Sequence, residues 1–175
     1  MIVVTGSCGF IGSNLIRALV KKGYPNILGI DYELRNYNLD LYVAETPAEN
    51  FYQNLESIHK KRKIDIIFHE GAISSTTETD NNKLFKYNLN CSMKLIYFCR
   101  DNDICLQYAS SASVYGNPTI EEWNSSNKKL DPLNLYANSK RQIDYIAEAV
   151  IDSKRQIGRA HVWTPVTLES RMPSS

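Results

Sequence analysis

The sequence predicts an α/β fold in which a parallel sheet is covered by helices on both faces. Short apolar runs without polar alternation recur along the 175 residues, as expected for strands that are buried on both sides. Stretches with apolar residues at helical spacing separate these runs, and such alternation is typical of parallel sheets. The first strand is followed directly by a glycine-rich turn and a helix, which is how a doubly wound sheet begins.

The predicted elements follow one another in a regular order. A β-branched strand at residues 2–4 leads through the glycine turn into a helix at 11–20, which ends in Lys21-Lys22-Gly23. A second strand at 27–30 ends at Asp31. Further along we expect helices at 55–63, 83–102 and 136–150, and strands at 64–69 and 105–109. The polar segments 32–54 and 116–135 are expected to be loops or short elements near the carboxyl edge of the sheet.

The overall composition argues against several classes of function. The chain has 20 Lys+Arg against 19 Asp+Glu, which removes the electrostatic basis for binding nucleic acid or a membrane surface. No apolar run approaches the roughly 18–20 residues of a membrane span, and the first residues lack the pattern of a signal peptide. The four cysteines have neither CxxC spacing nor a nearby His, so we expect no metal site and no disulfide framework. A cytoplasmic protein with reduced cysteines is the simplest interpretation.

The glycine-rich turn carries the first functional signal. Gly6, Gly9 and Gly12 allow, in turn, a tight turn, close approach to a pyrophosphate and close packing of the helix on the sheet. The phosphates would then meet the positive end of the helix dipole. The motif follows a strand, opens a helix and precedes Asp31 by about 20 residues, and this context predicts a Rossmann-type fold that binds a dinucleotide. Asp31 favours NAD and Arg35 favours NADP, and the residues leave that choice open.

A second signal lies nearer the C-terminus. Tyr136 and Lys140 form a YxxxK pair, whose spacing places both side chains on one face of a helix. An ammonium near a phenol oxygen favours the phenolate and makes a general acid/base that works near neutral pH. Ser111 follows the strand at 105–109 and brings a hydroxyl to the edge of the sheet where ligands bind. Together with the glycine turn, these three residues predict an oxidoreductive site that acts on an alcohol.

Four segments of the sequence resemble one enzyme family. They are TGSCGFIGSN (5–14), FHEGAISSTTETD (68–80), YASSASVYG (108–116) and PLNLYANSK (132–140). The chain resembles the extended short-chain dehydrogenases/reductases and, within them, the ADP-glyceromanno-heptose 6-epimerases. Three of the segments are shared by many nucleotide-sugar epimerases and dehydratases, whereas the HEGAISSTTE form resembles the heptose epimerases.

The resemblance implies roles for individual residues. Ser111 would be the catalytic serine, Tyr136 the acid/base and Lys140 its partner, while His69 is expected to be a structural ring. Asn88 would help to hold the site. The residues expected at the cofactor are Gly6, Gly9, Phe10, Ile11, Gly12, Asp31, Tyr32, Arg35, Glu70, Gly71, Ala72, Ile73, Ser74, Asn88 and Lys140.

The implied reaction inverts one carbon without net redox change. Bound NADP, with NAD as the other possibility, would take hydride from C6 of ADP-D-glycero-D-manno-heptose and return it to the opposite face of the ketone. The product is a lipopolysaccharide precursor, and the parent enzyme is expected to be a homo-oligomer. The alternatives are a 4-epimerase or a dehydratase of the same family, or a non-catalytic nucleotide-binding regulator. Ser111-Ala112-Ser113 lacks the acidic pair that is typical of dehydratases.

The resemblance also predicts the domain organisation. The family's chains continue into a nucleotide-sugar domain, whereas this sequence departs from their pattern after residue 156. We therefore expect an NAD(P)-binding domain at 1–156 that is incomplete at its C-terminal side and inactive alone. Residues 157–175 show no family pattern and are expected to be a non-native tail derived from cloning.

Overall fold

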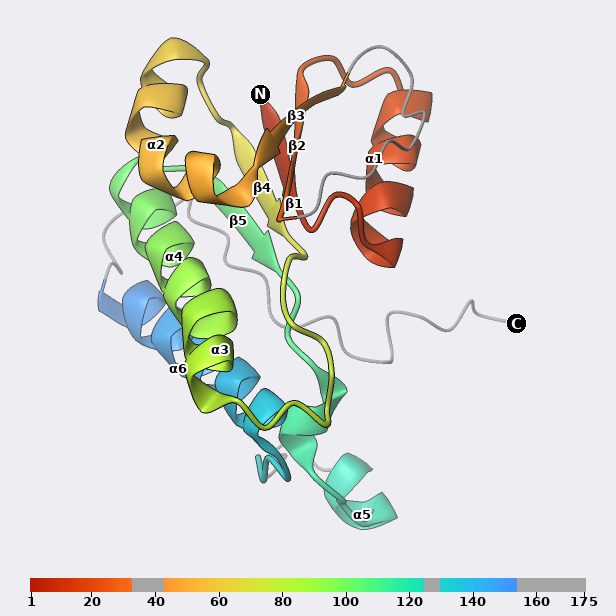
Figure 1. Cartoon of the computed structure of the whole chain (residues 1–175). Helices are drawn as coiled ribbons and strands as arrows, with labels where there is room; N and C mark the ends of the chain where they lie inside the picture. The colour runs from red at the N-terminus through yellow and green to blue at the C-terminus, as the bar shows by residue number, and fades with distance from the viewer. Residues whose placement is uncertain (33–42, 125–129, 154–175) are drawn as a thin grey trace.

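The computed structural model describes residues 1–32, 43–124 and 130–153 (Figure 1). Five parallel strands form one sheet in the order β3-β2-β1-β4-β5. Their bounds are β1 Ile2–Thr5, β2 Ile27–Asp31, β3 Val43–Pro47, β4 Ile66–His69 and β5 Cys105–Tyr108. The strand order reverses at β1, as in doubly wound sheets, so the predicted fold class is confirmed.

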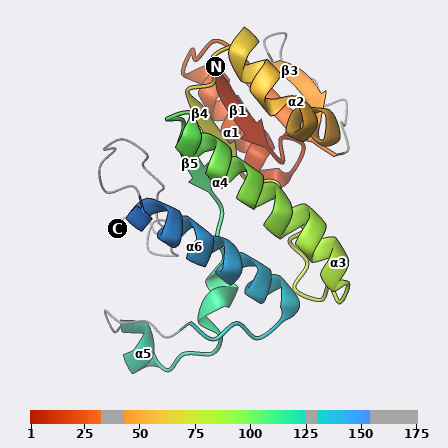
Figure 2. The same ribbon diagram turned by 90° about the vertical axis from the view of Figure 1, so that its left-hand side faces the viewer.

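Helices cover both faces of this sheet (Figures 1 and 2). Helix α1 (Phe10–Lys21) lies on one face, while α2 (Ala48–Lys61), α4 (Cys91–Asp101) and α6 (Leu135–Ser153) lie on the other. Successive strand residues face opposite layers. Val4 and Ile27 therefore pack with Ile16 of α1, whereas Val3 and Leu28 belong to a larger core on the opposite face.

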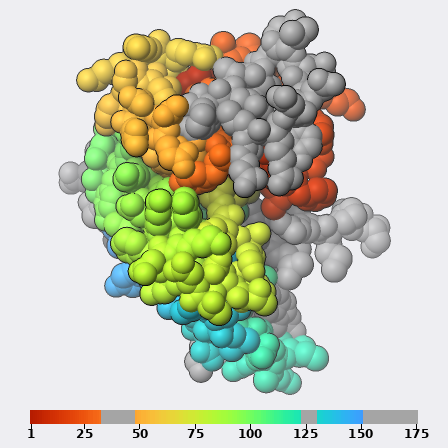
Figure 3. Space-filling view, in the orientation of Figure 1, coloured from red at the N-terminus to blue at the C-terminus, as the bar shows by residue number. Residues whose placement is uncertain are grey.

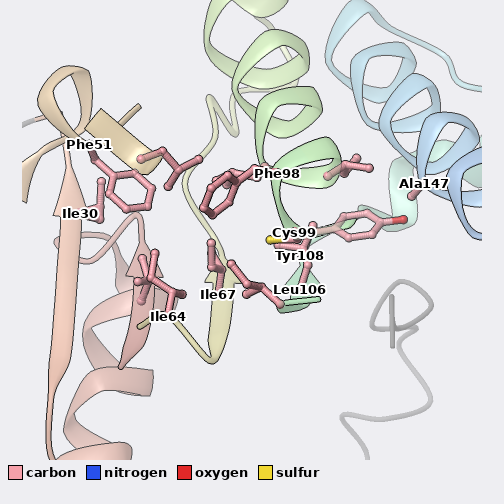
Figure 4. Close-up of a cluster of buried hydrophobic side chains, with 14 of the residues drawn as sticks. Ile30, Phe51, Ile64, Ile67, Phe98, Cys99, Leu106, Tyr108 and Ala147 are labelled. Atoms are coloured by element: carbon pink, nitrogen blue, oxygen red, sulfur yellow. The ribbon is translucent and has the colours of Figure 1, made fainter. Parts of the chain in front are cut away.

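The larger core holds three helices against the sheet (Figure 4). Phe51 of α2, Phe98 of α4 and Ala147 of α6 enter it, above the strand residues Ile67 and Leu106. All five are buried. Burial of a large apolar side chain contributes about 1.5–3 kcal/mol, so this cluster fixes the helices that carry the candidate site residues.

The prediction that residues 32–54 are irregular is wrong for its second half. These residues include strand β3 and the first half of α2. The strand sequence VAETP mixes polar residues with a proline, and a sheet tolerates proline at an edge strand. The sequence of β3 therefore lacks the apolar run that would have identified it as a strand.

The helix expected at 83–102 is present but not uniform. Helices α3 (Asn81–Leu84) and α4 are joined by a π-helical segment, η1 (Phe85–Asn90). A short helix, α5 (Ile120–Asn124), occurs within the expected loop region 116–135 and projects from the end of the molecule opposite to β3 (Figures 1 and 3). Arg35 and the predicted tail at 157–175 lie outside the described residues.

Two further observations concern the helices and the cysteines of the described residues. Among the helices of the described ranges, none combines the length and the apolar character that crossing a membrane requires. Cys8, Cys91, Cys99 and Cys105 are free thiols.

Candidate active site

The candidate residues converge at one edge of the sheet. In the parallel register, Thr5 pairs with Ile30 and with His69, and His69 pairs with Tyr108. The carboxyl ends of four strands therefore lie side by side. The glycine turn, the Asp31 side chain and the segments 70–74 and 109–111 all occur at or directly after these strand ends. Open α/β sheets bind ligands at this edge.

The glycine turn is pressed tightly against its neighbours. Gly6 has a φ of +67°, and a Cβ on it would lie 2.7 Å from the nitrogen of Gly71. A Cβ on Gly71 would in turn lie 2.9 Å from the Gly6 nitrogen, and one on Gly12 only 2.1 Å from the Gly6 carbonyl oxygen. Glycine is thus required at two positions of the turn, Gly6 and Gly12, and at Gly71 in the segment after β4, because these backbones lie in close contact.

The N-terminus of α1 is open to a ligand. Gly9 occupies the N-cap position, where no side chain caps the first turn. Phe10 and Ile11, which begin the helix, are 86% and 49% exposed. Accessible N–H groups at the positive end of a helix dipole suit a phosphate. The residues present therefore fit the pyrophosphate of a dinucleotide.

Asp31 and Tyr32 lie beside this turn. The Asp31 carboxylate accepts hydrogen bonds from the N–H of Cys8 at 2.8 Å and from the N–H of Tyr32 at 2.7 Å. The Tyr32 ring packs edge-on against Tyr87, with ring centroids 4.9 Å apart, and its hydroxyl lies 3.4 Å from Cys91 Sγ. The carboxylate predicted to bind a ribose is thus held next to the predicted phosphate site.

A chain of buried hydrogen bonds runs beneath the site. The Gly71 N–H donates to Thr5 Oγ1 at 3.1 Å, and Thr5 Oγ1 lies 2.7 Å from His69 Nδ1. On the other side of the ring, His69 Nε2 lies 2.9 Å from Ser92 Oγ, which donates to the Asn88 carbonyl oxygen at 2.7 Å. Because Ser92 gives its proton to Asn88, it accepts one from His69. The bonding pattern therefore assigns a neutral ring with its proton on Nε2.

Electrostatics agree with this neutral form. Burial, with a smaller contribution from the Lys140 charge, lowers the pKa of His69 to about 3. Only 4% of the surface of His69 is exposed to solvent. His69 therefore acts as a fixed hydrogen-bonding link between β1, β4 and α4 and not as a base.

The π-helical segment carries Asn88, whose side chain joins three parts of the site. Its Oδ1 accepts from the N–H of Ile73 at 2.8 Å, and its Nδ2 donates to the Ile73 carbonyl at 3.1 Å and to Ser139 Oγ at 3.2 Å. Ser139 Oγ donates to the carbonyl of Tyr136 at 2.7 Å. Asn88 is completely buried, so these bonds have no competition from water. It fastens the segment after β4 to the start of α6.

Tyr136 and Lys140 occupy successive turns of α6, and both are buried. Lys140 Nζ donates to the Ala109 carbonyl at 2.8 Å. Burial lowers the pKa of Lys140 to about 8, against the opposing effect of nearby carboxylates. Ser111 is the N-cap of the 3-10 helix η2 (Ala112–Tyr115), and its Oγ accepts from the Ser113 N–H at 3.3 Å. The ammonium thus lies at the end of β5, two residues before Ser111.

The other predicted residues extend the same edge or lie outside it. Glu70 and Ala72 are partly buried after β4, and Ser74 is exposed.

Sequence reasoning missed Thr5, Ser92 and Asp144. Asp144 was detectable in principle, because it lies one helical turn beyond Lys140 on the same face.

A parallel sheet with this glycine turn and these side chains at its carboxyl edge defines a dinucleotide-binding α/β domain. The model of the NAD dependent epimerase/dehydratase family matches residues 2–161. The chain belongs to that family.

Solved structures support the same assignment. An ADP-L-glycero-D-manno-heptose-6-epimerase from Helicobacter pylori is 27% identical, with a TM-score of 0.69, over 88% of this chain and 51% of that one. A UDP-N-acetylglucosamine 4-epimerase from Methanobrevibacter ruminantium is 26% identical, with a TM-score of 0.73, over 87% and 50%. A monomeric L-threonine 3-dehydrogenase from a metagenome is 25% identical, with a TM-score of 0.74, over 87% and 50%. The chain spans about half the length of each of these proteins.

Proposed function

We propose that this chain is the cofactor-binding part of a nucleotide-sugar epimerase, and that the full enzyme inverts C6 of an ADP-heptose with bound NADP. The observation that carries the proposal is the close approach of Gly6 to Gly71, where a Cβ on either glycine would overlap the other's backbone. It joins the glycine turn to the segment 68–80, whose sequence resembles the heptose epimerases. The likeness to the Helicobacter pylori 6-epimerase supports the same substrate class.

The cofactor would lie along the carboxyl edge of the sheet. The open N-terminus of α1 would hold the pyrophosphate, Asp31 and Tyr32 the adenosine ribose, and segment 70–74 the path to the nicotinamide. Arg35 would pair with the 2′-phosphate of NADP, whereas the Asp31 charge favours the free hydroxyl of NAD. When bound, the nicotinamide supplies reversible hydride exchange with the sugar carbon.

The chain's own residues would manage protons and orientation. Tyr136 would take the proton from the sugar hydroxyl and later return it, while Lys140 stabilises the phenolate by its charge. Ser111 would donate a hydrogen bond to the same sugar oxygen and hold it in place. The buried position of Lys140 at the Ala109 carbonyl, near Ser111, supports this division of roles. Free cysteines support a reducing, cytoplasmic location for the enzyme.

Substrate trials test the proposal against its alternatives. A full-length protein carrying this domain would be incubated with NADP or NAD and with ADP-D-glycero-D-manno-heptose, UDP-N-acetylglucosamine or L-threonine. We expect the L-glycero heptose epimer, identified by NMR of the product, and no oxidation of threonine. Turnover of the UDP-sugar alone would replace the substrate assignment. If none of the substrates reacts although NADPH binds, the proposed substrate is contradicted and the nucleotide-binding regulator becomes the favoured alternative.

The isolated chain gives a second test. We expect it to bind NADPH weakly, as followed by nicotinamide fluorescence, and to form no epimer, because its relatives are about twice as long. Formation of the epimer by this chain would show that the remaining half is dispensable. Absence of any dinucleotide binding, with the fold intact by circular dichroism, would contradict the proposed cofactor site.

A further inference from the structure

The end of β5 is fastened to α6 by two charged residues. Tyr108 Oη donates to Asp144 Oδ1 at 3.0 Å, and Ser110 Oγ donates to Asp144 Oδ2 at 2.7 Å. Between them, the Ala109 carbonyl accepts from Lys140 Nζ at 2.8 Å. Three consecutive residues are thus held by two side chains that lie one helical turn apart. Figure 4 shows the Tyr108 ring extending from β5 toward Ala147 of α6.

We propose that Asp144 is a positioning residue of the candidate active site, which fixes the strand end before Ser111 and places its carboxylate one helical turn from the Lys140 ammonium. This inference rests on the proposed roles of Ser111, Tyr136 and Lys140. Asp144 acts through these neighbours.

The Asp144 carboxylate is buried, so it is not an ordinary charged group of the surface. Asp144 is 4% exposed and Lys140 is 5% exposed. Burying two charges costs more free energy in lost hydration than their mutual attraction returns, unless hydrogen bonds satisfy both groups. Tyr108 and Ser110 occupy one oxygen each of the carboxylate, and the Ala109 carbonyl receives the ammonium. An apolar pair of similar size would stabilise the fold as well, so the charges point to a role in the site.

The charge of Lys140 is set by groups from three elements. On α6, Asp144 favours the ammonium; from the end of β4, Glu70 favours it less, and neutral His69 lies close enough to feel the Lys140 charge. From β5, Tyr108 contacts Asp144, and Glu148 on α6 acts on Asp144 as a like charge. Burial opposes these favourable effects and lowers the pKa of Lys140 to about 8. Of these two carboxylates, Asp144 thus favours the charged form of Lys140 more than Glu70 does.

The second effect of Asp144 is mechanical. Ser110 directly precedes Ser111, which is the N-cap of η2 and accepts the Ser113 N–H. The Ser111 carbonyl also accepts the Val114 N–H at 3.2 Å. Holding Ser110 therefore sets the direction in which the chain leaves β5 and turns into η2. Without Asp144, the hydroxyls of Tyr108 and Ser110 would lose their buried acceptor.

A double-mutant cycle on this chain tests the electrostatic part. Urea unfolding of wild type, Asp144→Asn, Lys140→Met and the double variant would be measured at pH 7 and pH 10. If Asp144→Asn lowers the Lys140 pKa from about 8 to about 7, the folding constant should fall about fivefold more at pH 7, where wild-type Lys140 is charged, than at pH 10. This extra loss should vanish in the Lys140→Met background. An equal loss at both pH values in both backgrounds would overturn the proposal.

A matched variant tests the mechanical part and remains available if Asp144→Asn does not fold. Tyr108→Phe with Ser110→Ala keeps the Asp144 charge but removes both donors. Amide hydrogen exchange at Ser113 and Val114 should then become about tenfold faster, while the exchange rates in β1 stay unchanged. Unchanged exchange at η2 would overturn the positioning role.

Cofactor binding separates this inference from the proposed function. In wild type the affinity for NADPH should weaken above about pH 8, where Lys140 loses its proton, and Asp144→Asn should move that midpoint to lower pH. An unmoved midpoint would overturn the inference. If no dinucleotide binds at any pH, the proposed function fails, while the unfolding cycle and the exchange measurement still decide the role of Asp144.

Discussion

Acid should destabilise this domain through His69. The folded-state pKa of the ring is about 3, whereas a histidine in an unfolded chain has a pKa of about 6.5. Between these values the unfolded chain binds a proton that the folded chain does not. The stability due to the neutral ring is therefore complete above pH 6.5 and is lost as the pH falls toward 3. Integration from pH 7.5 to pH 5 gives a loss of about 2 kcal/mol in the free energy of unfolding.

Comparison with His69→Gln isolates this effect. Glutamine keeps one donor and one acceptor but does not titrate, and the carboxylates titrate alike in both proteins. We expect the variant to be less stable at pH 7.5 by about 1–3 kcal/mol, since it cannot span both Thr5 and Ser92 as the ring does. In urea titrations, the difference in the free energy of unfolding between wild type and His69→Gln should be about 2 kcal/mol smaller at pH 5 than at pH 7.5. A difference that is independent of pH would refute the reasoning.

Nitrogen NMR of the ring provides a direct check. The His69 signals, assigned by their loss in His69→Gln, should report a proton on Nε2 and stay constant between pH 5 and pH 8. A ring that becomes cationic within this interval would contradict both the pKa and the direction of the hydrogen-bond chain.

Three further outcomes test the candidate site. Tyr136→Phe in a full-length protein should remove most epimerisation but leave NADPH affinity nearly unchanged, because only proton transfer is lost; turnover within about threefold of wild type would contradict the assignment. Arg35→Ala should weaken NADP binding by about 1.5–3 kcal/mol in calorimetric titration and spare NAD, and equal weakening of both would show that Arg35 does not discriminate. Gly71→Ala should lower the free energy of unfolding by about 1–3 kcal/mol and weaken NADPH binding in parallel, because its Cβ would meet the Gly6 nitrogen at 2.9 Å; a stable variant with normal binding would show that the two segments separate easily.

The sequence was sufficient for the parts of the fold that rest on buried apolar pattern. Strands β1, β2, β4 and β5 consist mainly of apolar residues, with one polar residue inside β5 (CLQY), and their order along the chain predicts a parallel sheet. Strand β3 was not predicted because its sequence, VAETP, mixes polar residues and a proline with apolar ones and so lacks an apolar run. The π-helical segment η1 was also not predicted, because one extra residue in a helical turn barely changes the spacing of the apolar residues.

The candidate site was predictable where backbone geometry restricts the residue type. The glycine turn is such a case, because a positive φ at Gly6 and a close contact at Gly12 admit only glycine. Thr5, Ser92 and Asp144 were not predicted, because small hydroxyl and carboxyl residues serve equally well as surface groups in a sequence. Their importance comes from burial and from partners that are distant along the chain, which only the folded structure brings together.

The irregular segment after β4 shows why this edge needs buried polar side chains. Residues 70–74 lie outside helices and strands, so their backbone groups have no regular ladder to join. Buried backbone groups must still find partners, or each costs about 1–3 kcal/mol. Thr5 receives the Gly71 N–H, and Asn88 receives the N–H of Ile73 and donates to its carbonyl. Side chains of β1 and η1 thus replace a ladder, and His69 connects them. Apolar residues there would pack as well, but they would not fix the direction of the segment that lies against the glycine turn.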